Sequence, residues 1–296
     1  FDAAGTKIEL RLGDPAESLV GRTRAAGLPD LPGRGLLADG TVCQLAVPDG
    51  PPRSPRRTAP VRVLPTTIVA PQAQGDGAFL LGVGGATCDP VAVDLLAPGR
   101  HLVVAGDAGS GRTTVLRRLV THLGAVADVH VVDPRRTLLV DATSWNHDPE
   151  SAAGQLRDIT RDLRRHLPDP GASPSEIADR TGGPVRSTYV VLDDLDLLAD
   201  HPLAGAALTD LASLLPYARE TGLHLVMVRP AAARTFDPLA ARMRAARPWL
   251  LQLPGEHLDG PAAGRAAPTL PGRGLLALGT GRAQEVQCYL TPTTAG

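Results

Sequence analysis

Residues 101 to 113 read His-Leu-Val-Val-Ala-Gly-Asp-Ala-Gly-Ser-Gly-Arg-Thr. The apolar run before the first glycine predicts a short buried strand. From Gly106 to Thr113 the spacing is that of a phosphate-binding P-loop. Glycines allow backbone geometry that a Cβ blocks, so successive N–H groups can surround a phosphate, and the following helix points its positive end at the same place. The stretch therefore predicts a site that binds ATP. The predicted nucleotide-binding residues are Gly106, Asp107, Ala108, Gly109, Ser110, Gly111, Arg112, Thr113 and Thr114.

Strand and helix signals alternate along the rest of the chain. Apolar runs predict strands at residues 101–105, 129–132, 189–192 and 224–228. Apolar residues at helical spacing predict helices at 113–123, around 156–167 with Pro168 as its stop, at 208–218, and at 238–246 with Asp237 as N-cap. Continuous apolar strands between amphipathic helices are typical of a parallel sheet that is covered on both faces. The predicted fold class is α/β.

A second motif, Tyr-Val-Val-Leu-Asp-Asp at residues 189 to 194, matches the Walker B pattern. Asp193 is predicted to hold Mg²⁺ through water, together with the hydroxyl of Thr113. Asp194 stands where a glutamate normally orients the attacking water, so it is a degenerate form of the catalytic base. A base that is displaced by about 1 Å can lose on the order of 10²-fold in rate. The alternative is that Asp193, Asp194 and Asp196 cap the next helix.

Arg112 occupies the position of the P-loop lysine. Lysine is a compact point charge on a flexible stem, whereas arginine carries a broad planar fork, so the two are not interchangeable at a tight site. The alternative is compositional drift, because Lys7 is the only lysine in the chain. Both interpretations predict binding. Together with Asp194, Arg112 predicts a site that holds ATP and hydrolyses it slowly or not at all.

Composition narrows the class of protein. The 296 residues carry a net charge of −1, which provides no overall field for nucleic acid or an anionic membrane. Three isolated cysteines indicate neither a disulfide framework nor a zinc site and agree with a reducing cytosol. No apolar run reaches the roughly 20 residues of a membrane span. The start at Phe1, without methionine or signal peptide, suggests a piece of a longer protein.

An internal repeat organises the chain. Leu-Pro-Gly-Arg-Gly-Leu-Leu occurs at residues 31–37 and again at 270–276. Around it, residues 8–14 match 250–256 loosely, and 44–48 match 289–292. We therefore expect residues 1–48 to be the C-terminal strands of a preceding module, residues 49–60 to be a Pro/Arg-rich linker, and residues 61–296 to be one whole P-loop module.

These motifs resemble the FtsK/SpoIIIE class of P-loop motors and, more closely, the third, C-terminal ATPase module of the EccC family of type VII secretion. The resemblance is carried by the repeat, the P-loop strand and the Walker B segment. It is carried further by Val131-Val132-Asp133-Pro134-Arg135-Arg136 and by the run from Gly222 to Pro230. It covers essentially the whole chain and implies a RecA-like fold, with a mainly parallel central sheet flanked by helices.

The resemblance also implies partners. In such proteins three ATPase modules follow one another on the cytosolic side of a membrane secretion complex. Later modules are often degenerate and recruit small helical secreted proteins through a C-terminal signal tail. The expected partners are therefore ATP with Mg²⁺, a substrate tail, adjacent modules of the same chain and, indirectly, the membrane complex. A polar residue near Arg229 is expected close to the γ-phosphate, and His224 is expected to serve strand packing.

Three hypotheses remain open at this point. The chain is a nucleotide-binding adaptor, or an active protein translocase that receives an arginine finger from a neighbour, or a DNA-pumping motor. The near-neutral charge and the strand-and-turn character of residues 250–296 count against the DNA motor. Arg135 and Arg136 either face a neighbouring module or are solvated.

Overall fold

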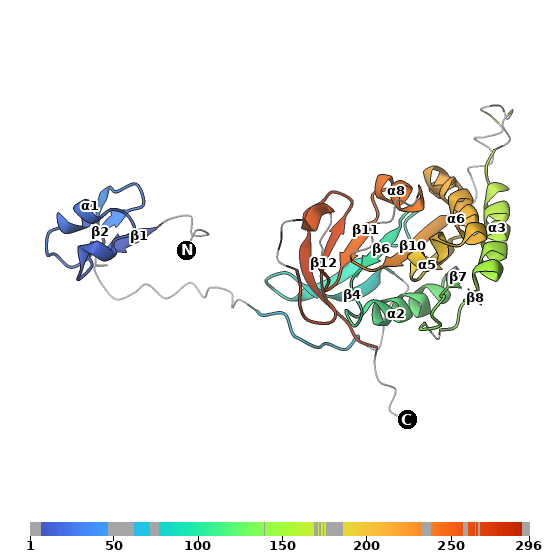
Figure 1. Ribbon diagram of the computed structural model, residues 1–296, viewed down its shortest axis with the longest axis horizontal. Helices are drawn as coiled ribbons and strands as arrows, with labels where there is room; N and C mark the ends of the chain where they lie inside the picture. Colours follow the sequence, from blue (N-terminus) through green and yellow to red (C-terminus); the bar gives the residue numbers. More distant parts are fainter. Residues whose placement is uncertain are drawn as a thin grey trace, which may run out of the picture. The chain divides into compact units, whose positions relative to one another are not determined.

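A computed structural model of the chain (Figure 1) describes residues 7–46, 62–71, 77–138, 140–168, 171, 173, 175, 186–231, 238–256, 260–263, 265 and 267–291. Two compact units are present, residues 1–60 and residues 61–296. The predicted linker at 49–60 and the predicted N-cap Asp237 lie outside the described residues. Within the described residues, no helix has both the length and the apolar character needed to cross a bilayer.

The second unit is built on a ten-stranded sheet with the order β5-β4-β13-β12-β11-β6-β10-β9-β7-β8. The six strands from β11 to β8 run parallel, and β12, β13, β4 and β5 extend the sheet in antiparallel fashion. The α/β class and the mostly parallel sheet are therefore confirmed. The strands are β4 (Phe79–Gly84), β5 (Asp89–Val93), β6 (Leu102–Ala105), β7 (Asp128–Val132), β8 (Ser144–Asn146), β9 (Thr188–Leu192), β10 (Leu223–Arg229), β11 (Trp249–Gln252), β12 (Arg273–Leu278) and β13 (Gln284–Cys288).

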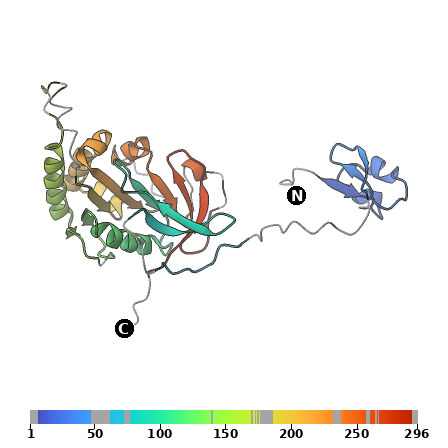
Figure 2. The same ribbon diagram turned by 180° about the vertical axis from the view of Figure 1, so that it is seen from behind.

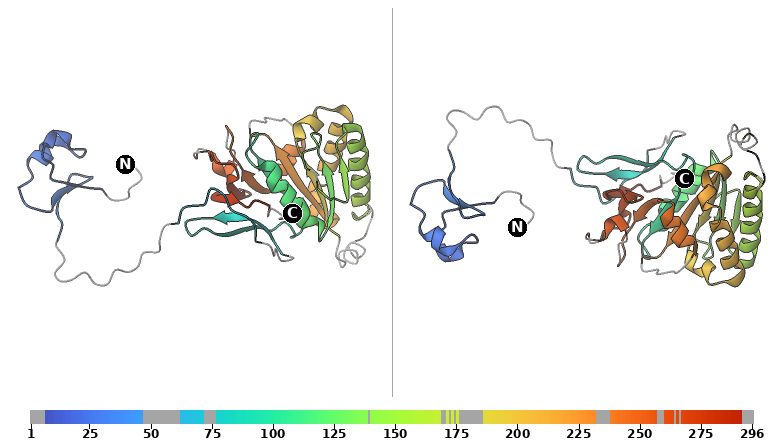
Figure 3. Two further views of the ribbon diagram at one scale, coloured as in Figure 1. Left: turned by 90° about the horizontal axis from the view of Figure 1, so that it is seen from below. Right: turned by 90° about the horizontal axis from the view of Figure 1, so that it is seen from above.

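Helices cover the two faces of this sheet, as Figures 1 and 2 show from opposite sides. On one face, the apolar side of α2 packs on alternate residues of β6, β7 and β10. On the other face, α3, α5, α6 and α8 pack on the intervening residues of the same strands. Figure 3 shows α3 and β12 at opposite ends of this unit. The helices are α2 (Arg112–Gly124), α3 (Pro149–Arg164), α5 (Leu195–Ala199), α6 (Pro202–Ala212), α7 (Ala218–Thr221) and α8 (Pro238–Ala245).

One predicted helix is placed wrongly. The structure has no continuous helix over 208–218: α6 begins earlier and ends at Ala212, and a 3-10 turn at Leu215–Tyr217 leads into α7. Pro216 accounts for the break, because proline lacks an N–H donor and clashes with the carbonyl four residues before it. Pro202 occupies the tolerated first turn of α6. The hairpin β4–β5, strand β8 and helix α5 are additional to the prediction.

The first unit is a small antiparallel sheet, β1 (Ile8–Leu10), β2 (Arg34–Leu37) and β3 (Val42–Gln44), with a 3-10 turn at Pro15–Glu17 and α1 (Arg22–Ala26). Its pairing repeats that of β11, β12 and β13. The two copies also share a loop in which a glutamine side chain donates to a proline carbonyl. These bonds are Gln44 Nε2 to Pro32 O at 2.9 Å and Gln287 Nε2 to Pro271 O at 3.3 Å.

The strand register corrects the expected match between the two copies. Ile8 lies opposite Leu37, and Leu251 lies opposite Leu276, the repeat equivalent of Leu37. Ile8 therefore corresponds to Leu251, one residue away from the expected Leu250. In the same way, Gln44 corresponds to Gln287 and not to Tyr289, because each pairs with the arginine of its repeat. Backbone pairing fixes the register, and a shift of one residue moves a side chain to the other face.

Candidate nucleotide site

The P-loop lies between β6 and α2 with backbone geometry that requires glycine. Gly109 and Gly111 have φ angles of 76° and 103°, in the left-handed region. At Gly106 a Cβ would lie 2.6 Å from Ser110 Oγ and 2.8 Å from Leu253 Cβ, so no larger residue fits. Since α2 begins at Arg112, its free N–H groups and positive dipole end face the loop. This arrangement provides a cradle for phosphate.

Asp107, predicted as part of the nucleotide site, anchors the loop to the ends of two neighbouring strands. Its carboxylate accepts hydrogen bonds from the backbone N–H groups of Ala231 (3.3 Å) and Glu256 (3.1 Å), which follow β10 and β11. Its own N–H donates to Pro254 O at 2.8 Å. At the adjacent position, the N–H of Gly106 donates to Arg229 O at 3.3 Å. The side chain of Asp107 thus holds the P-loop in place, a role that the sequence did not indicate.

The second copy of the repeat touches the P-loop. Gly272 N donates to Ser110 O at 2.8 Å, and a Cβ on Gly111 would lie 3.2 Å from Gly272 N. The N–H of Cys288 donates in turn to Gly272 O at 2.8 Å. In the sequence, the repeat indicates only where one module ends and the next begins. The structure shows that its second copy also forms one wall of the phosphate loop.

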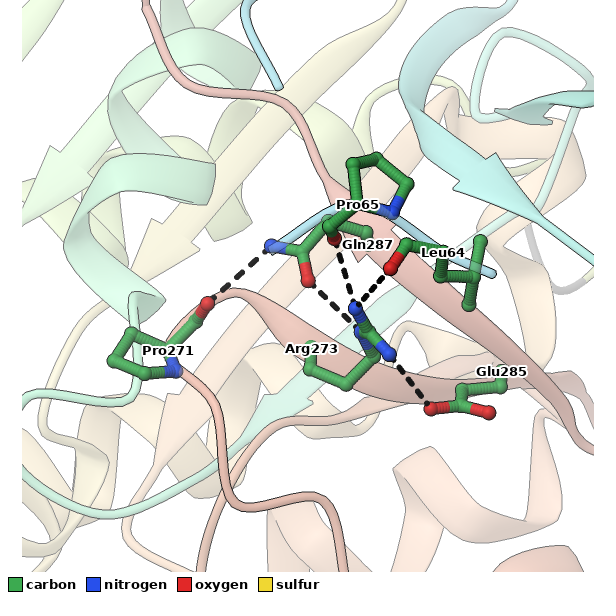
Figure 4. Close-up of polar contacts among 6 residues, drawn as sticks. All are labelled: Leu64, Pro65, Pro271, Arg273, Glu285 and Gln287. Carbon is green, nitrogen blue, oxygen red and sulfur yellow. Dashed lines mark hydrogen bonds and ion pairs between the residues drawn. The ribbon is translucent and has the colours of Figure 1, made fainter. Parts of the chain in front are cut away.

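Arg273, the next residue of the repeat, ties this wall to the segment before β4 (Figure 4). Its Nη2 donates to the carbonyls of Leu64 (3.0 Å) and Pro65 (2.8 Å), and its Nε donates to Gln287 Oε1 (2.8 Å). Its Nη1 bonds to Glu285 Oε1 at 3.2 Å. The guanidinium therefore joins two antiparallel strands to a chain segment more than 200 residues away.

Asp193, the predicted Mg²⁺ residue, is buried directly after β9, and its N–H bonds to Val132 O at 2.9 Å. Its Oδ1 accepts from the N–H of Asp194 at 3.0 Å. Burial raises the pKa of Asp193 to about 6, with a further upward contribution from the charge of Asp194, whereas Arg112 acts in the opposite sense. The Walker B end of β9 therefore lies beside the P-loop.

Asp194 connects the two motifs. Its Oδ1 lies 3.9 Å from Nη1 of Arg112, and its Oδ2 lies 2.6 Å from Nε of Arg135. Asp194 is buried and has a φ of 44°. It stands at the N-cap position of α5, yet its side chain makes no capping hydrogen bond there. The capping alternative therefore fails for Asp194, because its carboxylate is directed to arginines.

The structure also shows where four further residues from the sequence analysis lie. Thr113 and Thr114 lie half-buried in the first turn of α2. His224 is buried, stacks on Tyr189 with ring centroids 4.4 Å apart, and hydrogen-bonds through Nδ1 to Arg100 O, as expected for strand packing. Arg135 is 60% exposed, but it is not a free solvated side chain, because its guanidinium forms an ion pair with Asp194. The alternative that it faces a neighbouring module stays a prediction.

The residues present fit a nucleoside triphosphate. Nη1 of Arg112 is buried beside the glycine loop, has no hydrogen-bond partner among the described residues, and lies 3.9 Å from Asp194 Oδ1. Among the described residues no group of three or more His, Cys, Asp or Glu could hold a metal ion. Mg²⁺ at a P-loop needs few protein ligands, because phosphates and water complete its octahedron. Thr113 and Asp193 are the residues that would hold it.

The chain is similar to known nucleotide-binding proteins. Residues 97–235 match the family model of an AAA domain. The chain is 36% identical, over 98% of its length, to the ESX-4 secretion system protein EccC4 of Mycobacterium tuberculosis. It is 31% identical, over 92% of its length, to the ESX secretion system protein EccC of Thermomonospora curvata. The chain belongs to the EccC family of P-loop ATPases. It spans about a quarter of the length of these relatives, 26% and 24%.

Solved structures agree. The cytoplasmic domain of the Thermomonospora curvata type VII secretion ATPase EccC aligns with a TM-score of 0.71 and 26% identity, over 96% of this chain and 37% of that one. The structure of Thermomonospora curvata EccC (ATPases 2 and 3) in complex with a signal sequence peptide aligns with a TM-score of 0.70 and 28% identity, over 98% of this chain and 59% of that one. The predicted resemblance to EccC is therefore confirmed, and nucleotide binding follows from the P-loop domain.

Proposed function

We propose that this chain is an ATP-binding, hydrolysis-impaired module of a type VII secretion motor, which recruits secreted substrates through their C-terminal signal tails. The observation that carries the first half is the approach of Arg112 to Asp194. Arg112 stands at the position of the phosphate-binding lysine, and Asp194 stands at the position of the residue that orients the attacking water. Their charged groups lie 3.9 Å apart. In this ion pair the guanidinium and the carboxylate neutralise each other, and neither is positioned for ATP hydrolysis.

A binding assay and a single-turnover assay test the nucleotide half. We expect a fluorescent ATP analogue to bind in the presence of Mg²⁺, and Thr113→Ala to weaken that binding, since Thr113 supplies the metal hydroxyl. Phosphate release in a single turnover is expected to be slow or absent, and Arg112→Lys combined with Asp194→Glu is expected to raise it. Rapid release by the parent chain, lost in Thr113→Ala, would contradict the impaired module.

Substrate recruitment is supported by the solved relative whose ATPases 2 and 3 were captured with a signal sequence peptide. We propose the same role here for a small helical substrate with a C-terminal tail, bound on this module. Fluorescence polarisation with labelled C-terminal tail peptides measures it. Saturable binding that a scrambled peptide of equal composition does not reproduce is the expected result. Equal binding of both peptides would refute sequence-directed recruitment.

The assignment of residues 1–48 to a preceding module is proposed from a comparison of strand β1 with its equivalent, β11. In the first unit Ile8 and Leu10 are 45% and 48% exposed. Their equivalents Leu251 and Leu253 are 0% and 1% exposed, because they pack in the core formed with α2 and β6. An apolar face of this kind is stable in water only when another layer covers it. We therefore propose that residues 1–48 close a preceding ATPase module of the same chain.

The setting of the module is proposed on the same family relationship. We place it on the cytosolic side of a cell membrane, joined to adjacent ATPase modules and through them to a membrane secretion complex.

A second candidate is an active translocase, for protein or DNA, that needs a neighbouring subunit. The exposure of Arg135 supports this candidate, because a neighbouring subunit that binds the guanidinium would release Asp194. Phosphate release that appears only on addition of an adjacent module would support it. Salt-sensitive duplex binding is the requirement for the DNA form, and nucleic acid is not an expected partner at a net charge of −1.

A further inference from the structure

Arg135 is presented by an ordered turn that follows β7. Asp133 closes this turn twice, since its Oδ2 accepts the N–H of Leu138 at 2.7 Å and its carbonyl accepts the N–H of Arg136 at 3.1 Å. Its own N–H donates to Asn146 O of β8 at 2.8 Å. Arg136 has a φ of 58°, a left-handed conformation that is uncommon outside glycine. The turn is therefore held in a defined, strained shape.

The same turn is attached to both halves of the phosphate site. On the P-loop side, Nη2 of Arg117 in α2 donates to Thr137 O at 2.5 Å. On the Walker B side, the hydroxyl of Thr137 lies 3.5 Å from Asp193 Oδ2. Arg135 thus comes from an element that spans the site and is not a freely solvated side chain.

Both oxygens of Asp194 are engaged by cations in this arrangement, at 2.6 Å by Arg135 and at 3.9 Å by Arg112. Asp194 and Arg136 both adopt left-handed backbone conformations at positions that carry side chains. Such conformations are unfavourable for residues with a side chain and persist where the surrounding structure holds them in place. The short bond to Arg135 is a charge-assisted contact between a buried carboxylate and a guanidinium, which is the stronger class of hydrogen bond.

We propose that Arg135 is a positioning residue that keeps Asp194 from orienting water, so that bound ATP is retained. This inference rests on the proposed ATP binding. During hydrolysis the water oxygen adds to the γ-phosphorus, the bond from that phosphorus to the β–γ bridging oxygen breaks with its electrons leaving on ADP, and a water proton passes to an acceptor. Because both oxygens of the Asp194 carboxylate are taken up by guanidinium groups, neither oxygen is free to orient the attacking water. When ATP draws Arg112 to its phosphates, Arg135 alone still holds Asp194.

The first test needs no nucleotide. Melting temperatures are measured for the parent chain, Arg135→Ala, Asp194→Asn and the double variant. If the pair exists, Arg135→Ala lowers the melting temperature of the parent but causes a much smaller change in the Asp194→Asn background. Arg165→Ala is the matched control, because Arg165 is an exposed arginine in an ion pair with Asp162 at 3.1 Å, remote in sequence from the site. Additive effects of the two changes would overturn the proposed pair.

The second test uses Mg-ATP. Arg135→Ala is expected to raise single-turnover phosphate release by roughly 10²-fold, the lower end of what a general base contributes. The dissociation constant of a fluorescent ATP analogue is expected to change little. Arg135→Lys is expected to restore part of the suppression, and Asp194→Asn to abolish the gain. Unchanged release by Arg135→Ala, or weakened binding without a gain in release, would overturn the inference. Absence of ATP binding by the parent chain would instead defeat the proposed function and leave the nucleotide-free test to decide the ion pair.

Discussion

Replacement of Asp107 by alanine tests whether this residue anchors the P-loop. The change removes an ionised acceptor from the backbone N–H groups of Ala231 and Glu256. Hydrogen bonds to a charged group contribute about 1.5–3 kcal/mol each. Their lengths of 3.3 and 3.1 Å are at the long end of the usual range. The lower value therefore applies, and the expected loss is about 3 kcal/mol in the free energy of unfolding.

For a domain of this size, a loss of about 3 kcal/mol lowers the melting temperature by roughly 6–12 °C. Urea unfolding and calorimetry at neutral pH measure it. Asp107→Asn is the matched control, because the amide oxygen keeps one acceptor, and we expect about half of the effect. A melting temperature for Asp107→Ala equal to that of the parent would show that the two bonds do not hold the loop, and the anchoring role would be refuted.

Three further predictions concern pH, the repeat and the first unit. Burial, with the nearby His224 charge, lowers the pKa of His101 to about 4 from 6.5, so stability is lost as pH falls from 6.5 to 4, by up to about 3 kcal/mol. The pKa of Asp193 is raised to about 6, so this group adds stability as pH falls from about 6 to 3.8 and opposes the effect of His101. The test is therefore the difference in the free energy of unfolding by urea between the parent and His101→Asn, measured as a function of pH. A difference that does not change with pH would contradict the prediction. Arg273→Ala is expected to expose residues 62–71 to limited proteolysis while the sheet stays folded, and unchanged cleavage would contradict the tie to Leu64 and Pro65. Deletion of residues 1–60 is expected to reduce the fluorescence of a hydrophobic dye, because Ile8 and Leu10 are lost, and equal dye binding by both chains would contradict an uncovered face.

Local hydrophobic patterns in the sequence were sufficient to predict most strands of the parallel part of the sheet. The continuous apolar runs gave β6, β7, β9 and β10 to within one residue at each end, because strands buried on both faces are apolar throughout. The β4–β5 hairpin was missed, since its strands contain one proline and two glycines, and β4 is stabilised by pairing to the distant strand β13. The helix predicted over 208–218 was wrong because the apolar spacing continues across Pro216, whereas the backbone hydrogen bonds do not.

The chemistry that is local in the chain could be predicted from contiguous motifs. The glycine spacing from Gly106 to Gly111, the hydroxyl of Thr113 and the acidic pair after β9 each follow from a short contiguous motif, and these motifs specify a phosphate site and the family. Arg112 and Asp194 could also be recognised as departures, because each stands at a fixed position in its motif.

The groups that Arg112 and Asp194 face depend on the three-dimensional fold. Arg112, Asp194 and Arg135 lie on three different elements of the fold, and no spacing rule relates them. The parallel sheet places the ends of β6, β7 and β9 at one edge, and this brings the carboxylate between the two guanidinium groups. In the same way, the repeat predicted a module boundary, but the fold placed Gly272 against the P-loop and Arg273 on the carbonyls of the segment before β4. Contacts between distant segments depend on how the strands are ordered, and that order is a property of the whole chain.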